Sequence, residues 1–349
     1  LFVAASDVYK RQENGFLDFF MKTSQKIHDY IQKNQQATGK ELADHLPDIT
    51  PRAVRKQLKN LLDNEVLYKI GKPPKVFYLL KQPTAKTTAI GKKSYAVSPS
   101  IKKTVEKRFF YISPTGKQIE GWEGFVAWCT KNHQEPVKTA LEYTKTLAKY
   151  DAFSQNGVID GMSKLRSTFD EVYLDKLFYL DFYSIERFGK TRLGQMLLYA
   201  KQSQNKNLIK SLILEIQPAI ERLIAKYDID GLVFVPPTVK REVQLMKELE
   251  KQLQLPVAKL IVTKVKTDIP VPQKTLSKLT DRVENARYTI VVEDNKKYQN
   301  ILIIDDAVGS GATINQTAAQ IRQKKLCAGK IVGLAITGSY KGFDVISEV

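Results

Sequence analysis

The segment from residue 301 to residue 314, ILIIDDAVGSGATI, constrains the fold of this chain more than any other stretch. Its four leading apolar residues predict a buried strand, and this strand ends in two adjacent carboxylates, Asp305 and Asp306. A Gly-Ser-Gly sequence then permits a tight loop, because glycine adopts backbone conformations that other residues avoid. Thr313 begins a predicted helix with its apolar residues on one face. The chain after about residue 169 alternates helices with short β-branched strands, and this alternation predicts an α/β fold with a parallel sheet.

The chemistry of this segment indicates the kind of ligand that it would bind. Main-chain N–H groups in the Gly-Ser-Gly loop can converge on an anion, and a phosphate held there would lie at the positive end of the helix dipole. Asp305 and Asp306 would repel that phosphate if they faced it, so they are better placed as acceptors for neighbouring hydroxyl groups. A ribose has two such hydroxyls. A phosphate beside a diol describes a 5-phosphoribosyl group.

These residues resemble the signature with which type I phosphoribosyltransferases bind phosphoribosyl pyrophosphate (PRPP). The resemblance implies that Asp305 and Asp306 bind the 2′ and 3′ hydroxyls of the ribose, that residues 309–313 hold the 5′-phosphate, and that Mg²⁺ accompanies PRPP. Gly309 departs from the signature, which usually has a hydroxyl residue at that position. The expected PRPP-binding segment consists of Asp305, Asp306, Ala307, Val308, Gly309, Ser310, Gly311, Ala312 and Thr313.

A second buried strand is predicted within residues 231–237, GLVFVPP. In the phosphoribosyltransferase fold, the loop after this strand resembles the one that accepts the pyrophosphate, and a basic pair in that loop suits a polyanion. The residues expected in this pyrophosphate loop are Pro236, Pro237, Thr238, Lys240 and Arg241.

Residues 175–345 also resemble ComF-type phosphoribosyltransferase domains in two further places. Residues 190–201 are similar to the opening helix of those domains, and Pro272, Gln273, Leu276, Arg282 and Asn285 follow the spacing seen before their PRPP strand. Two departures accompany the resemblance. The Arg-Gly-Phe-Asn-Gln stretch usual after the pyrophosphate loop is absent, and no four-cysteine zinc element precedes the domain.

The N-terminal section carries the signals of a winged helix-turn-helix domain. Thr38 and Glu41 make a predicted capping box, and Thr50 before Pro51 predicts the start of a second helix. This second helix, residues 51–63, has an apolar stripe on one face and basic residues on the other. Two short strands follow, at residues 66–70 and 76–80, joined by a Gly-Lys-Pro-Pro-Lys turn. We call this two-stranded hairpin the wing.

The resemblance to winged helices implies that helix 51–63 enters the major groove of DNA while the wing contacts phosphates. Some winged helices mediate protein contacts instead, and this alternative stays open. The residues expected to contact DNA are Arg52, Arg55, Lys56, Lys59, Lys72 and Lys75.

The chain of 349 residues exceeds the usual size of one core, so several domains are expected. The fold class that we predict is α/β, a type I phosphoribosyltransferase fold with a parallel sheet flanked by helices, preceded by a winged helix domain and a small α+β middle section. The expected sections are a leader outside the native fold at residues 1–14, the winged helix domain at 15–80, a basic linker at 81–108, a mainly helical middle section at 109–174 and the phosphoribosyltransferase-like domain at 175–349.

The composition narrows the classes of function. The formal net charge is +18, and residues 1–110 hold 21 Lys and Arg against 10 Asp and Glu, which suits a polyanionic partner. The cysteines are Cys129 and Cys327, and neither lies at a metal-ligand spacing from another ligand, so we expect neither a disulfide scaffold nor a metal site of the protein's own. No apolar run approaches the roughly 20 residues that span a bilayer, so we expect a cytoplasmic protein without a membrane partner.

Two functions from different classes follow. The first is a regulator of transcription that binds PRPP as a signal and double-stranded DNA as a target, because a winged helix fused to a PRPP-binding domain resembles the purine-operon repressors of this fold. The second is an active phosphoribosyltransferase that transfers phosphoribose from PRPP to a nitrogen acceptor. A third reading is a nucleic-acid processing factor that uses the fold to bind nucleotide ends. The oligomeric state is left open, with a homodimer as one arrangement.

Overall fold

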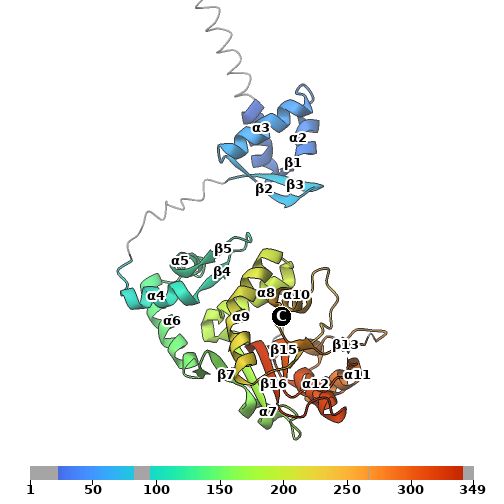
Figure 1. The fold of residues 1–349 in the computed structure, drawn as a ribbon. Helices are drawn as coiled ribbons and strands as arrows, with labels where there is room; N and C mark the ends of the chain where they lie inside the picture. The colour runs from blue at the N-terminus through green and yellow to red at the C-terminus, as the bar shows by residue number, and fades with distance from the viewer. Residues whose placement is uncertain (1–22, 82–94, 266, 341–349) are drawn as a thin grey trace, which may run out of the picture. The chain divides into compact units, whose positions relative to one another are not determined.

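The computed structural model describes residues 23–81, 95–265 and 267–340, and the chain divides into two compact units, Leu1–Ser94 and Tyr95–Val349 (Figure 1). The predicted leader at residues 1–14 and residues 82–94 of the predicted linker lie outside the described residues. Among the described residues, no helix combines the length and the apolar character needed to cross a membrane.

The first unit combines short helices with a three-stranded antiparallel sheet in the order β1-β3-β2. Both predicted helix starts are confirmed, since Thr38 and Glu41 form the reciprocal capping box and the Thr50 hydroxyl accepts the Ala53 N–H at 3.3 Å. Val54 and Leu58 are buried in the core of this unit. Its elements after the helical residues 23–34 are β1 (Ala37–Thr38), α2 (Gly39–His45), α3 (Pro51–Asp63), β2 (Leu67–Lys72) and β3 (Lys75–Leu80).

The turn between β2 and β3 requires glycine at position 71. Gly71 has a φ of +86°, which side chains rarely adopt, and a Cβ added there would lie 2.3 Å from the Lys75 carbonyl oxygen. This turn brings Lys72 and Lys75 opposite each other as the last pair of the two strands. The expected two-stranded hairpin with lysines at its tip is therefore present.

The second unit alternates helices and strands over a longer chain. Its first part contains α4 (Pro99–Arg108), β4 (Phe110–Ile112), β5 (Gln118–Glu120), α5 (Gly121–Lys131), α6 (Pro136–Asp151), β6 (Ser154–Gln155), β7 (Val158–Asp160) and α7 (Met162–Thr168). Its central part contains β8 (Lys176–Phe182), β9 (Ser184–Ile185), η1 (Glu186–Phe188), β10 (Gly189–Lys190), α8 (Arg192–Ser203), α9 (Lys206–Lys226), β11 (Gly231–Phe234) and α10 (Leu245–Leu253). Its last part contains β12 (Ala258–Lys259), β13 (Val262–Lys264), η2 (Gln273–Thr275), α11 (Leu279–Thr289), β14 (Ile290–Val292), β15 (Ile301–Val308), α12 (Ala312–Gln323) and β16 (Ile331–Gly338).

A seven-stranded sheet in the order β12-β11-β15-β16-β8-β7-β6 organises this unit. The pairs from β12 to β8 are parallel, and β7 and β6 extend the edge in antiparallel pairing. The prediction of an α/β fold with a mostly parallel sheet flanked by helices is confirmed at this level. The two apolar residues Ile303 and Ile304 of β15 pack into different clusters, because successive side chains of a strand point to opposite faces. Helices α8, α9 and α10 cover one face of the sheet and α7 and α12 cover the other (Figure 1).

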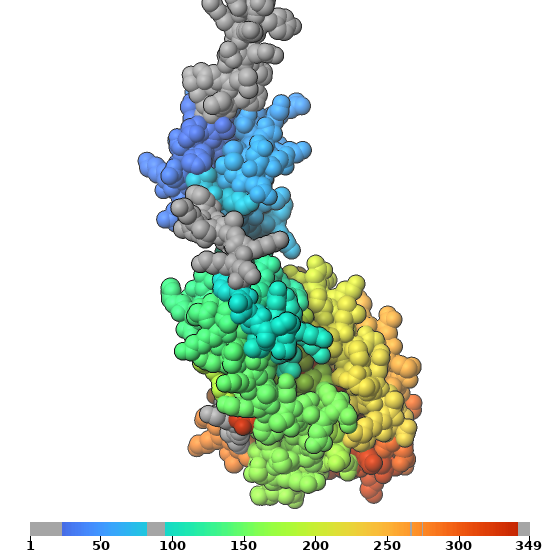
Figure 2. Space-filling view, turned by 90° about the vertical axis from the view of Figure 1, so that its left-hand side faces the viewer, coloured from blue at the N-terminus to red at the C-terminus, as the bar shows by residue number. Residues whose placement is uncertain are grey.

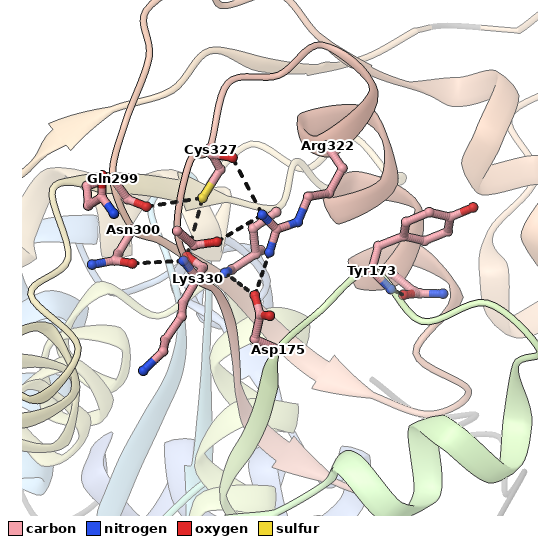
Figure 3. Close-up of polar contacts among 10 residues, drawn as sticks. Tyr173, Asp175, Gln299, Asn300, Arg322, Cys327 and Lys330 are labelled. Atoms are coloured by element: carbon pink, nitrogen blue, oxygen red, sulfur yellow. Dashed lines mark hydrogen bonds and ion pairs between the residues drawn. The ribbon is translucent and has the colours of Figure 1, made fainter.

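A polar network fixes the amino-terminal ends of the parallel strands (Figure 3). The Arg322 guanidinium, near the end of α12, pairs with the Asp175 carboxylate at 2.6 Å and donates to the Gly329 carbonyl at 2.9 Å. The same Asp175 carboxylate accepts the Ile331 N–H at 2.7 Å, so it joins the starts of β8 and β16. Asn300 accepts the Lys330 N–H just before β15. Hydrogen bonds and an ion pair thus occupy the amino-terminal ends of the parallel strands. The candidate site lies at their carboxyl-terminal ends.

Two expected boundaries are wrong. Residues 99–108 are not linker but helix α4, which begins at a Ser98 cap followed by Pro99 and buries Val105 in the core of the second unit. The high lysine content of this stretch concealed its apolar contacts, Val105 and the partly buried Ile101. Residues 109–174 are not separate from the C-terminal section either, because Ile159 and Asp160 of β7 pair with β8.

The middle section also packs against the helices that follow β8. The Arg192 guanidinium at the start of α8 pairs with Glu120 of β5 at 3.0 Å and with Glu215 of α9 at 2.9 Å. In Figure 2 the green and cyan residues of this section lie beside the yellow residues of α9 on one continuous surface. The sequence did not predict these contacts, because the strands of this section are short and their partners lie far away in the chain.

Candidate functional site

A pocket of about 190 Å³ opens at the carboxyl-terminal ends of β11 and β15. After β11 the chain continues to β12 on one side, whereas after β15 it continues to β16 on the other, so the two strands meet at a switch in strand order. Ligands of open α/β sheets bind at such switch points. The lining residues are Lys201, Val235, Pro236, Pro237, Thr238, Val239, Arg241, Lys264, Pro272, Gln273, Arg282, Asp305, Asp306, Ala307, Val308, Gly309, Ser310, Gly311, Ala312, Thr313 and Ile314.

The glycine loop between β15 and α12 forms one wall of this pocket. Gly311 has a φ of +87°, and a Cβ added there would lie 2.6 Å from Cδ1 of Leu165. The buried Ser310 hydroxyl accepts the Ala312 N–H at 3.3 Å, which tightens the turn into the helix. Because α12 begins at Ala312, the first N–H groups of this helix and the positive end of its dipole point to the same place. Such a loop is chemically suited to a phosphate.

The two acids lie in the last half of β15 rather than after its end. β15 extends to Val308, four residues beyond the apolar run from which the strand was predicted. The Asp306 N–H donates to the Asp305 carboxylate at 2.8 Å, and the Asp306 carboxylate accepts the Lys201 ammonium at 2.8 Å. Burial is the main cause that raises the pKa of Asp305 to about 7, and the neighbouring charge of Asp306 adds to it, against the opposing attraction of Lys201 and Lys264.

Four cationic side chains from different parts of the chain line the pocket. Lys201 is at the end of α8, and Lys264, at the end of β13, donates to the Thr238 hydroxyl at 2.8 Å. Burial lowers the pKa of Lys264, and the Asp305 charge opposes that shift. The remaining two cations are Arg241 and Arg282, which line the same pocket.

The segment from Pro272 to Arg282, which contributes three residues to the pocket lining, is held by hydrogen bonds around Arg282. The Arg282 Nε donates to the Leu276 carbonyl at 2.8 Å, and the side chain is only 4% exposed. Burial lowers the pKa of this guanidinium. The Gln273 amide donates to the Arg282 carbonyl at 3.0 Å and to the Asn285 side chain at 2.9 Å. The residues whose spacing resembled ComF-type domains therefore contact one another beside the pocket.

The structure brings together most of the predicted site. All residues of the expected PRPP-binding segment line the pocket, and so do Pro236, Pro237, Thr238 and Arg241 of the expected pyrophosphate loop. Lys240 of the same expected loop is exposed and does not line the pocket.

Neither Lys201 nor Lys264 was predicted from the sequence as a residue of the site. Lys201 follows the buried Leu197 by four residues and so lies on the apolar face of α8, where a charged residue signals a special environment. No comparable signal marks Lys264, because β13 has only three residues and pairs with a strand distant in sequence.

The donor set of the pocket does not fit a resident Mg²⁺. Magnesium prefers near-octahedral oxygen ligands, and the described residues contain no group of three or more His, Cys, Asp or Glu side chains that could hold a metal. The Asp306 carboxylate already accepts an ammonium, and Lys264 attracts Asp305.

The first unit presents the second candidate site, a basic surface on α3 and the wing. Helix α3 turns Val54 and Leu58 into the core, which leaves the basic residues of the opposite face exposed. The exposed residues of this basic surface are Arg52, Arg55, Lys56 and Lys59 on α3 with Lys72 and Lys75 on the wing. All six residues predicted to contact DNA are thus accessible to a polyanion.

The wing also exposes apolar side chains. Val66, Tyr68 and Ile70 alternate along β2 and its approach, so they share one face of the sheet, and they are 36%, 40% and 43% exposed. Leu67 between them is buried in the core of the unit. An apolar face of this kind is suited to a protein contact more than to a phosphate backbone.

The pocket and the basic surface are chemically complementary to anions of different size. Comparison with known proteins adds no family to this description, since no protein-family model and no curated protein matches the chain.

Proposed function

We propose that the second unit binds PRPP in the pocket described above and that the first unit binds double-stranded DNA, so that the chain is a PRPP-responsive regulator of transcription. One observation carries the proposal. Two segments far apart in the sequence, the acid pair with its glycine loop and the loop after β11, line one pocket at the switch point of the sheet.

Each part of PRPP has a chemically matched part of the pocket. The 5′-phosphate is placed at the glycine loop, where helix α12 begins and N–H groups are available. The ribose hydroxyls are placed at Asp305 and Asp306, which accept hydrogen bonds as carboxylates. The pyrophosphate is placed near Arg241 and Lys264, because these cations compensate its charge.

The regulator is favoured over the enzyme by what the site lacks. Gly309 provides no hydroxyl where the phosphoribosyltransferase signature usually has one, and Lys240 is outside the pocket. Ground-state binding can survive such losses, whereas turnover needs interactions that strengthen in the transition state. We therefore expect PRPP to bind in the micromolar range, about −8 kcal/mol, with little or no consumption.

The cations near the pyrophosphate position support the enzyme as a second candidate. In that reaction the bond between C1 of the ribose and the pyrophosphate oxygen breaks, and pyrophosphate leaves with the electron pair. A nitrogen of the acceptor forms the new bond to C1 and loses its proton. Arg241 and Lys264 would stabilise the departing charge. Base-dependent release of pyrophosphate with adenine, guanine, hypoxanthine, uracil or orotate would establish this reaction.

Removing the acid pair tests the proposed ligand. Asp305→Asn with Asp306→Asn keeps the size of both side chains and removes both charges. Hydrogen bonds to charged groups contribute about 1.5–3 kcal/mol each, so calorimetry is expected to show at least a roughly 100-fold loss of PRPP affinity. Thermal melting checks that the double variant is folded.

Asp268→Asn is the matched control, because Asp268 is exposed and does not line the pocket. This variant should bind PRPP as the wild-type chain does. Unchanged PRPP affinity in a folded Asp305→Asn/Asp306→Asn chain would contradict the assignment of the pocket.

A further inference from the structure

The acid pair of the pocket is compensated by lysines before any ligand enters. The Lys201 ammonium lies 2.8 Å from the Asp306 carboxylate, and the two side chains are only 13% and 17% exposed. An ion pair with so little solvent around it is stronger than a pair on the surface, because water screens it less. Lys264 is half-buried and lies close enough to Asp305 for each to shift the pKa of the other.

The lining of the pocket carries more basic than acidic side chains. The lining residues include the four cations Lys201, Arg241, Lys264 and Arg282 and two acids, Asp305 and Asp306. The pocket is therefore positive by two charges when both acids are ionised. A dication entering beside two ammonium groups would be repelled by them and would have to displace Lys201 from Asp306 to gain that oxygen ligand.

The position of Lys201 is determined by a rigid part of the fold. Its helix, α8, buries Leu197 and Ala200 against the sheet, which fixes the end of the helix beside β15. Gln204, directly after this helix, accepts the Val243 N–H at 2.7 Å and so ties the end of α8 to the segment that follows the pyrophosphate loop. The ammonium is thus held beside Asp306, at the ribose end of the proposed ligand site.

We propose that Lys201, supported by Lys264, takes the place of a divalent cation, so that this pocket binds PRPP without Mg²⁺. The inference rests on the proposed function, since it concerns the same ligand. Lys201 keeps one ammonium donor on Asp306 and offers the others to oxygens of the bound pyrophosphate, because an ammonium has three N–H donors. The charge that Mg²⁺ would bring is supplied by the chain itself.

Calorimetry of PRPP binding to the full chain, in EDTA and in millimolar Mg²⁺, tests this inference. We expect the two dissociation constants of the wild-type chain to agree within about threefold. Lys201→Met should weaken binding in EDTA by at least about tenfold, and Mg²⁺ should recover part of that loss, because the metal can then use the vacated carboxylate. Lys201→Arg keeps the charge and should bind without Mg²⁺. Lys210→Met, on the exposed side of α9, is the matched control and should behave as wild type.

Each other result overturns the inference in a distinguishable way. Binding by the wild-type chain only when Mg²⁺ is present would overturn it and leave the proposed function standing. No binding of PRPP in either buffer would overturn both. Equal affinity of wild type and Lys201→Met in EDTA would show that the ammonium has no such role. If Lys201→Met does not fold, as thermal melting would show, the wild-type comparison and Lys264→Met decide the question.

Discussion

Asp305 is the residue of the pocket whose ionisation is coupled to the stability of the fold. Burial raises the pKa of this carboxyl to about 7, whereas an unfolded chain ionises the same group near its ordinary value of 3.8. The folded state therefore favours the protonated form. The contribution of Asp305 to the free energy of unfolding is therefore fully present below about pH 4. It is lost as the pH rises towards 7, because the unfolded chain releases this proton at a lower pH than the folded chain does.

Asp305→Asn should remove this dependence on pH. Relative to the variant, the unfolding free energy of the wild-type chain is expected to fall by up to about 4 kcal/mol between about pH 4 and pH 8. Urea denaturation of both proteins across this range measures the difference. The exposed Asp268→Asn serves as a control that should follow the wild-type curve. A difference between wild type and Asp305→Asn that does not vary with pH would contradict the burial of this charge.

At the scale of elements, the turn from β15 into α12 depends on Gly311. Its φ of +87° strains any side chain, and an added Cβ would lie 2.6 Å from Cδ1 of Leu165. Gly311→Ala therefore has to distort the loop that lines the pocket. We expect it to cost about 1–3 kcal/mol of unfolding free energy and to weaken PRPP binding, measured by urea denaturation and calorimetry.

A second glycine, Gly116 in the turn between β4 and β5, allows the effect of backbone strain to be measured apart from the effect of the contact with Leu165. It has a similar φ of +79°, but no atom lies within 4 Å of an added Cβ. Gly116→Ala should therefore show the backbone strain without the clash and should leave PRPP affinity unchanged. Equal losses of stability in the two variants would mean that the contact with Leu165 contributes nothing.

Helix α3 is the element on which the DNA-binding half of the proposal depends. Its exposed Arg52, Arg55 and Lys56 would displace condensed counterions from duplex DNA. Replacing all three by Ala in the full chain should weaken DNA binding and make its dependence on salt less steep, by up to about 0.9 per lost phosphate contact in the slope of log K against log salt. Fluorescence anisotropy at several salt concentrations measures both quantities.

A variant with the same loss of charge elsewhere provides the control for α3. Lys138→Ala, Lys145→Ala and Lys210→Ala remove three exposed cations from helices α6 and α9 of the second unit. This control should retain the salt slope of the wild-type chain. If it loses DNA affinity as the α3 variant does, binding follows net charge rather than a winged helix. If the wild-type chain binds no duplex at low salt, the apolar face with Tyr68 and Ile70 makes a protein contact the better reading.

At the scale of the whole molecule, the sequence predicts structure that depends on neighbouring residues better than it predicts contacts between distant parts of the chain. The capping residues Thr38 and Thr50 and the apolar run before Asp305 act within a few residues, so they predicted the two helices and the strand correctly. Most of the pocket followed from such signals. Lys264 and strand β7 owe their places to partners distant in the chain, and no local pattern contains that information.

The lysine-rich composition of one segment led to a wrong prediction although a local signal for a helix was present. The Ser98 cap and Pro99 mark the start of α4, yet the surrounding lysines indicated a linker. Val105 is buried in the core of the second unit, and the partly buried Ile101 packs against the same core. The boundary between the two compact units consequently falls at Ser94, before the helix rather than after it.

The last prediction concerns the coupling of the two ligands across the whole chain. If PRPP is a signal, its binding must change the affinity for DNA, typically by a factor between about 5 and 150, and DNA must change the affinity for PRPP by the same factor. Anisotropy with labelled duplex, with and without saturating PRPP, measures the first factor, and calorimetry of PRPP with and without duplex measures the second. Asp305→Asn/Asp306→Asn should bind DNA but lose the response to PRPP, since the acid pair lies in the second unit and the basic surface lies in the first. Unequal factors would mean that the two measurements do not report one equilibrium, and rapid, base-dependent release of pyrophosphate would favour the enzyme. A chain that shows neither coupling nor turnover would leave the pocket as a binding site with neither proposed role.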